Sequence, residues 1–136
     1  MLNPYLMFDG ECEAAFKFYE QCFGGTLNAM MKHSEMPASE KIPEGMDDKI
    51  MHACLTIGDR MLMASDCPPG YYSAPAGMYV QFSADSAEEA ERIFAALSEN
   101  GTVQMAIGET FWATRFGMVT DRFGTPWMIN FAEKTC

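Results

Sequence analysis

An internal repeat constrains the fold of this chain more than any other feature of its sequence. Residues 18–26 (FYEQCFGGT) and 94–102 (FAALSENGT) lie 94 − 18 = 76 positions apart, with phenylalanine, glycine and threonine at matching positions. Self-similarity at a fixed distance is typical of a duplicated structural unit. We therefore predict two copies of one unit, residues 1–66 and 77–136, joined by a linker at residues 67–76 that contains proline and glycine.

Apolar residues at helical spacing predict one amphipathic helix in each copy. The first pattern ends at a glycine pair, residues 24–25, and its apolar positions are Cys12, Ala15, Phe16, Tyr19 and Phe23. The second pattern follows a capping box formed by Ser86 and Glu89, and its apolar positions are Ala90, Ile93, Phe94 and Leu97. Each helix needs one face of a sheet to cover its apolar stripe.

Stretches rich in aromatic, β-branched and other apolar residues predict the strands. They are residues 3–8, 26–33, 49–57 and 60–66 in the first copy, and 78–83, 111–120 and 127–131 in the second. We expect each copy to be a βαβββ unit with a four-stranded sheet, which makes the fold class α+β. One face of each sheet stays free of a helix, so two mixed sheets that curl toward each other would enclose a cup. The open edges and apolar hollow of such a protein favour a homodimer.

Charge and hydropathy exclude several classes of partner. Nine Lys and Arg against nineteen Asp and Glu give a net charge of −10, whereas nucleic acids and anionic membranes are bound through Lys and Arg. No apolar run approaches the roughly 20 residues of a membrane span, and the first five residues lack the basic region of a secretory signal. The five cysteines include no Cys-x-x-Cys pair, so they indicate neither a disulfide framework nor a zinc site. We expect a single cytoplasmic domain, residues 1–136, without nucleic-acid or membrane partners.

Aromatic and hydrogen-bonding side chains are concentrated in a predicted hairpin at residues 109–131. Both tryptophans, Trp112 and Trp127, lie there, and Asp121 and Gly124 supply the capping group and the positive φ of its turn. Large aromatic surface beside a few polar groups is typical of a small-molecule site. The candidate ligand contacts in this hairpin are Trp112, Arg115, Met128 and Asn130.

Each polar candidate in the hairpin also has a structural interpretation. Arg115 could bind an anionic group or pair with the acidic surface. Asn130 alternates onto the side of Met128, where its amide could bind a ligand or make a structural hydrogen bond. Trp112 could stack on a ligand or belong to the core. Glu109, at the entrance of the predicted strand, is a candidate general acid or base, or else a turn cap.

A second candidate centre lies around His52. The period of a strand places Cys54 and Thr56 on the same face as His52. If His52 and His33 converge with Glu109 or Asp66, they could form a metal site or an acid–base site. The alternative is a sheet histidine held by an ordinary hydrogen bond.

Three motifs resemble one protein family. They are the opening PYLMFDG, the segment MHA at residues 51–53, and the closing ETFWAxxFGxVTDxFGxPWMIN. With the duplication, they are similar to the PhnB-like branch of the vicinal oxygen chelate superfamily, which includes glyoxalase I, bleomycin resistance proteins and extradiol dioxygenases. The resemblance implies paired βαβββ units, usually in a dimer. In catalytic relatives it also implies a divalent metal held by His or Glu on the first, fifth and eighth strands.

The matching positions in this chain do not offer the usual metal ligands. They are Pro4 or Tyr5, Met78 or Tyr79, and Met128, whereas borderline and hard cations prefer imidazole, carboxylate or thiolate. We therefore predict that the standard metal site is absent and expect no cofactor. Some relatives are described as similar to a demethylubiquinone methyltransferase. A methyltransferase with a Rossmann fold needs a glycine-rich loop between a strand and a helix. Here the glycine pair follows a helix, so the sequence does not predict a methyltransferase of that class.

The sequence thus predicts a homodimer that binds a small, partly apolar molecule in its cup, with Tyr5 and Asp66 as further candidate contacts. The alternative is an enzyme of lyase, isomerase or oxygenase type. It would use a non-standard metal site near His52 or acid–base catalysis by Glu109. A third class, a structural or interaction module, would have a filled cup and bind no small ligand.

Overall fold

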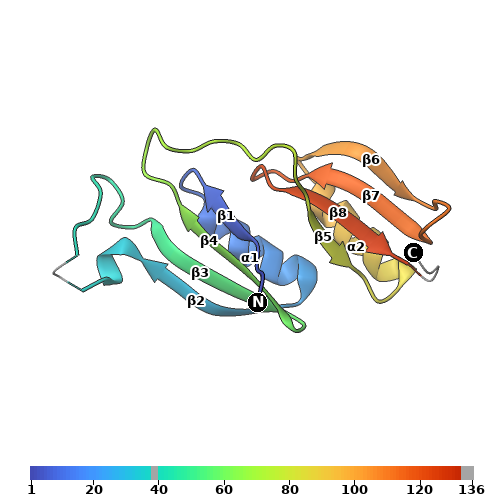
Figure 1. Cartoon of the computed structure of the whole chain (residues 1–136), viewed down its shortest axis with the longest axis horizontal. Coiled ribbons are helices and arrows are strands. Elements are labelled where there is room, and N and C mark those ends of the chain that lie inside the picture. Colours follow the sequence, from blue (N-terminus) through green and yellow to red (C-terminus); the bar gives the residue numbers. More distant parts are fainter. Residues whose placement is uncertain (38–39, 133–136) are drawn as a thin grey trace. The chain divides into compact units, whose positions relative to one another are not determined.

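The computed structural model describes residues 1–37 and 40–132, and the chain divides into two units, Met1–Ser73 and Ala74–Cys136 (Figure 1). Each unit contains one four-stranded sheet and one α-helix. This confirms the predicted pair of βαβββ units and the α+β class. None of the helices in the described ranges is long and apolar enough to cross a membrane.

The first unit begins with the β1 strand and continues through one helix and three antiparallel strands. Its elements are β1 (Tyr5–Phe8), α1 (Cys12–Phe23), β2 (Thr26–Lys32), the 3-10 turn η1 (His33–Glu35), β3 (Ile50–Ile57) and β4 (Arg60–Asp66). The strand order across the sheet is β1-β4-β3-β2, with β1 parallel to β4. The first and last strands of the unit are therefore neighbours.

The second unit repeats this arrangement. Its elements are β5 (Val80–Ser83), α2 (Ala87–Ser98), β6 (Thr102–Gly108), β7 (Arg115–Thr120) and β8 (Pro126–Phe131). The order is β5-β8-β7-β6, with β5 parallel to β8. Shifting every strand of the first sheet by four gives the second, as expected for a duplicated unit.

Three predicted strand starts were wrong by two residues or more, and the first is the strand predicted from residue 3, which begins at Tyr5. The strand predicted from residue 111 begins at Arg115, because Thr110 and Ala113 close a turn before it: Thr110 N donates to Ala113 O, and Ala113 N donates to Thr110 Oγ1, both at 3.0 Å. Phe111 and Trp112 therefore belong to this turn. The strand predicted from residue 78 begins at Val80.

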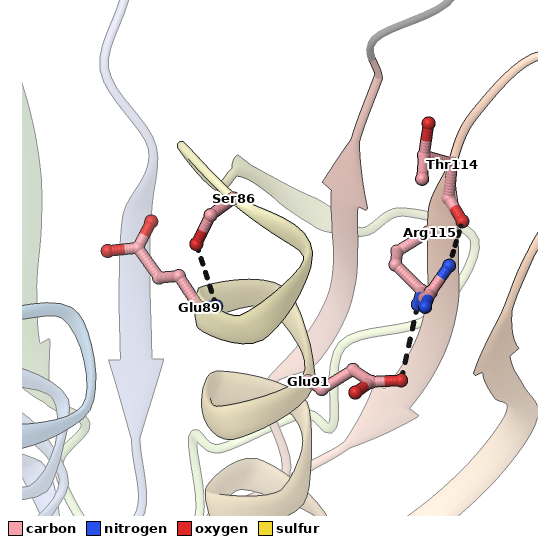
Figure 2. A network of polar contacts seen from close by, with 5 residues as sticks. All are labelled: Ser86, Glu89, Glu91, Thr114 and Arg115. Carbon is pink, nitrogen blue, oxygen red and sulfur yellow. Dashed lines mark hydrogen bonds and ion pairs between the residues drawn. The ribbon is translucent and has the colours of Figure 1, made fainter.

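The helix ends follow the predicted local signals. Gly24 ends α1 in the left-handed conformation, with φ 70°, and its N–H donates to Glu20 O at 3.0 Å. At the start of α2, Glu89 N donates to Ser86 Oγ at 3.0 Å (Figure 2). Glu89 Oε1 accepts from Asp85 N at 2.8 Å. These bonds satisfy amide groups that a helix leaves unpaired at its first turn.

The repeated glycines occupy the same structural position in both units. A Cβ added to Gly25 would lie 2.5 Å from Thr56 O, and a Cβ added to Gly101 would lie 2.5 Å from Thr120 O. Real Cβ atoms do not approach a carbonyl oxygen so closely, so glycine is required where the chain leaves each helix and passes the edge of a neighbouring strand. The sequence repeat therefore has a steric cause.

Each helix covers one face of its own sheet with fully buried side chains. On α1 these include Phe16 and Tyr19, packed with residues such as Leu55 of β3. On α2 they include Ile93 and Leu97, and the sheet beneath contributes Val119, Trp127 and Ile129. Burial of such side chains stabilises each unit by roughly 1.5–3 kcal/mol per large residue. The opposite face of each sheet is free of its own helix.

Candidate functional site

The two faces of the first sheet are distinguished by Asp66. Asp66 Oδ1 accepts from Cys12 N at the start of α1 at 3.0 Å, so Asp66 and the alternate residues of β4 face α1. Because successive side chains of a strand point to opposite faces, Met63 and Ser65 point away from α1. Their cross-strand partners and the alternate residues of β3 and β4 form what we call the helix-free face of the first sheet: Tyr5, Met7, His52, Cys54, Thr56, Met61, Met63 and Ser65.

A polar cluster lies in this otherwise thioether-rich face. Tyr5 Oη is 3.3 Å from His52 Nδ1 and donates to Ser65 Oγ at 3.3 Å. Ser65 Oγ in turn donates to the sulfur of Met7 at 3.5 Å. Tyr5 is 46% exposed, and its ring centroid lies 6.0 Å from that of His52. Three strands thus bring a phenol, an imidazole and a hydroxyl together.

The helix-free face of the second sheet is identified by Gly117. A Cβ on Gly117 would lie 2.6 Å from a ring carbon of Phe94 on α2, so Gly117 and its partner Ile129 face the helix. Their neighbours along β7 and β8 therefore face the other way. With the partners from β5, this helix-free face comprises Gln81, Ser83, Phe116, Met118, Met128 and Asn130.

Trp112 extends this second face. Its ring is 5.4 Å from that of Phe116 in an edge-to-face arrangement, and Phe111 packs against Trp112 at 4.9 Å. Phe111 is 89% exposed, whereas Trp112 is only partly exposed. Of the four predicted ligand contacts in the hairpin, the structure brings three to this face: Trp112, Met128 and Asn130.

Arg115, the fourth, points to the helix side of the second sheet. Its Nε is 3.2 Å from Glu91 Oε1 on α2, and its Nη1 donates to Thr114 O at 2.8 Å (Figure 2). This arrangement corresponds to the alternative interpretation, pairing with an acidic residue. Glu109 is exposed just after β6, so it precedes the turn at residues 110–113 and does not enter a strand.

Asp66 has a structural environment. It is 5% exposed, Oδ1 accepts from Cys12 N at 3.0 Å and Oδ2 accepts from Ile50 N at 2.9 Å. It therefore joins the start of α1 to the start of β3. Asp66 lies on the face of the sheet opposite His52, so these two residues do not meet the condition of convergence.

The turn that supports the second face is organised by buried Asp121. Its Oδ1 accepts from the backbone N–H groups of Phe123 at 2.8 Å and Thr125 at 3.1 Å. Its Oδ2 accepts from Trp127 Nε1 at 2.8 Å. Gly124 has φ 91°, the positive value predicted for this turn. Asp121 thus orients β8 and places Trp127 in the core.

Several residues of the two faces were missed by the sequence reasoning. Ser65 and Met63 are two, and on the second sheet Phe116, Met118 and Gln81 are others. The alternation of residues 61, 63 and 65 was visible in the sequence. The sequence did not show that β1 and β4 are neighbours in the sheet, because these strands are separated by more than fifty residues.

The donors on these faces do not fit the divalent metal of catalytic relatives. On the strands in question the chain carries Tyr5 and Met128, and Met78 and Tyr79 precede β5. Within residues 1–37 and 40–132, no three His, Cys, Asp or Glu side chains are grouped closely enough to hold a metal ion. His52 is 3.3 Å from the Tyr5 phenol, which bonds the Ser65 hydroxyl, and both groups are poor ligands for such a cation. Cys54 adds one thiol to this face beside them.

The fold and the sequence together identify the family. Residues 1–129 match the Glyoxalase/Bleomycin resistance protein/Dioxygenase superfamily. The chain therefore belongs to this superfamily, which confirms the resemblance seen in its motifs.

Individual relatives extend over nearly the whole chain. Protein YjdN of Escherichia coli K12 is 39% identical, over 98% of this chain and 96% of its own. The crystal structure of protein PA1353 from Pseudomonas aeruginosa is 49% identical, with a TM-score of 0.89 and coverage of 97% of both chains. A Bacillus cereus PhnB protein shares the fold at 22% identity, with a TM-score of 0.79 over 96% of this chain and 98% of that one.

Proposed function

We propose that this protein binds a small, partly apolar organic molecule on the helix-free face of the second sheet. The observation that carries this proposal is the grouping of Phe116, Met118 and Met128 beside Trp112, with the amide of Asn130 among them. Apolar and aromatic surface with a few placed polar groups is the usual composition of a ligand site. Methionine side chains adapt to ligands of irregular shape because they are unbranched and flexible.

The polar groups suggest how such a ligand would be oriented. Gln81 on β5 is the cross-strand partner of Met128, and Asn130 on the adjacent strand β8 is the partner of Phe116. Each amide can both donate and accept, so a carbonyl or hydroxyl group on the ligand would find a partner. The net charge of −10 disfavours strongly anionic molecules, and Arg115 is paired with Glu91 on the other side of the sheet.

A neutral fluorescent probe, N-phenyl-1-naphthylamine, tests this proposal. We expect its fluorescence to rise on binding to the full chain. Replacing both Met118 and Met128 by glutamine should weaken binding about tenfold, which is about 1.4 kcal/mol. Tyr71→Ser is the control, because Tyr71 is a largely exposed aromatic residue outside both sheets. Unchanged binding in the double variant, or an equal loss in the control, would refute the proposed face.

A second candidate function, metal-free acid–base catalysis, is favoured by the Tyr5–His52–Ser65 cluster. The phenol lies within 3.3 Å of both the imidazole and the hydroxyl, so a proton could pass between these groups and a substrate bound beside them. Incubating the protein with a small-molecule cell extract, followed by mass spectrometry, would reveal any consumed component. His52→Gln should abolish that consumption, and equal consumption by both proteins would exclude this role. Glu109→Gln tests the other candidate base in the same way.

The name of the Bacillus cereus PhnB protein also suggests a 3-demethylubiquinone-9 3-methyltransferase, but the local structure of this chain does not support a methyltransferase with a Rossmann fold. The glycine pair at residues 24–25 ends α1, and each sheet is mixed with a single helix, unlike the parallel, doubly covered sheet of a Rossmann fold. The predicted homodimer and cytoplasmic location stay predictions.

A further inference from the structure

The helix-free face of the first sheet carries a group of sulfur atoms that the proposed ligand site does not use. Cys54 Sγ donates to Met61 Sδ at 3.6 Å. Met63 is the direct cross-strand partner of Cys54, and side chains of such partners have Cβ atoms about 4.5–5.5 Å apart. One thiol and two thioethers therefore project from neighbouring positions of β3 and β4.

We propose that Cys54, Met61 and Met63 form a binding site for a soft monovalent cation, copper(I) or silver(I). Thiolate and thioether sulfurs are the ligands that select copper(I), whereas hard divalent cations prefer oxygen and nitrogen. This site differs in place and chemistry from the divalent site of catalytic relatives, which uses imidazole and carboxylate.

The geometry suits a single metal ion. With the zinc–sulfur bond length of about 2.3 Å as a guide, two sulfurs on one metal lie at most about 4.6 Å apart. The 3.6 Å between Cys54 Sγ and Met61 Sδ is within this limit. Met63 can bring its sulfur to the same ion by rotating its unbranched side chain. Binding would form metal–sulfur bonds and release the thiol proton of Cys54 to solvent, and no electron would be transferred.

The surroundings of the three sulfurs also favour a soft cation. Cys54 is buried at 8% exposure, while Met61 and Met63 are partly exposed, so the group lies near the surface in a poorly hydrated place. His52 lies two residues from Cys54 on the same face and offers a further nitrogen ligand at the border of the site. A weakly hydrated ion loses less hydration in such a place than a divalent ion would.

Silver(I), which is not reduced or oxidised in the assay, is the probe for a test by native mass spectrometry and isothermal titration calorimetry. All variants carry Cys136→Ser, which removes the thiol outside the described residues. We expect this background protein to bind one silver ion. Cys54→Ser and the double change of Met61 and Met63 to leucine should each weaken binding at least about tenfold, about 1.4 kcal/mol.

Cys67→Ser is the matched control, because Cys67 lies in the same unit and is also 8% exposed. Its silver binding should equal that of the background. Methionine-to-leucine changes conserve volume and are well tolerated, so the double variant tests the site even if Cys54→Ser fails to fold. Binding that is unchanged in both site variants, or reduced equally in the control, would overturn the proposal.

Discussion

The carboxylate of Asp121 should make a large contribution to the stability of the second unit. It is 4% exposed and accepts three N–H groups, two from the turn backbone and one from Trp127. In Asp121→Asn, one amide oxygen can still serve the turn, but the new NH2 group then faces the Trp127 N–H. Hydrogen bonds to charged groups contribute about 1.5–3 kcal/mol each. We therefore expect Asp121→Asn to lower the free energy of unfolding by about 2–3 kcal/mol.

Asp121→Ala should cost more, because it removes all three acceptors. Each buried donor left unsatisfied costs about 1–3 kcal/mol, so a total of roughly 3–6 kcal/mol is expected. Urea unfolding followed by tryptophan fluorescence measures the effect, since both tryptophans lie in the second unit. Circular dichroism in the same samples reports the unfolding of both units together, because each contains a helix and a sheet.

Glu99→Gln is the control for this experiment. It removes the same charge from the same unit. The Glu99 side chain, however, is 72% exposed, and its Oε2 lies as far as 4.0 Å from Arg122 Nη2. Exposed ion pairs contribute about 0–1 kcal/mol, so this variant should unfold close to the wild type. If Asp121→Asn unfolds within about 0.5 kcal/mol of the wild type, or no more easily than Glu99→Gln, the assigned role of the Asp121 carboxylate is wrong.

Three further predictions concern local features. Gly25→Ala and Gly101→Ala should each destabilise their unit by about 1–3 kcal/mol in a urea titration, because the new Cβ clashes with a carbonyl oxygen. Gly108→Ala is the control and should be tolerated, because a Cβ there meets no atom within 4 Å. Ser86→Ala should cost about 1 kcal/mol of unfolding free energy by removing the cap of α2, and no change would mean that the cap is replaced by solvent. Burial, followed by the charges of Asp66 and Glu13, raises the pKa of the Cys12 thiol above its ordinary 9.0. The unfolded chain then loses a proton that the folded chain keeps, so stability should fall as pH rises above about 9, by up to about 1.4 kcal/mol per pH unit. Cys12→Ala should flatten this dependence in urea titrations across that range, and an unchanged slope would contradict the assignment.

Local patterns in the sequence predicted both helices, the duplication and most of the strands, but gave no range for β6 (Thr102–Gly108). The helix of residues 12–23, the capping box at Ser86 and the turn at Asp121 depend on interactions within a few residues. Such signals survive without tertiary information because the partners are neighbours in the chain. The strand start at residue 111 was wrong because apolar composition there indicates a strand, although Thr110 and Ala113 close a turn.

The composition of the candidate sites was decided by the tertiary structure. Tyr5, His52 and Ser65 meet because β1 pairs with β4 and β4 pairs with β3, and only the strand order creates that relation. Register decided the rest, since a shift of one residue moves a side chain to the opposite face of a sheet. Register placed Arg115 and Asp66 on the helix sides, where each has a structural partner. It placed Met128 and Asn130 on the helix-free face. The sequence by itself therefore determined which side chains were available and in which elements, and the pairing of distant strands determined which of them share a surface.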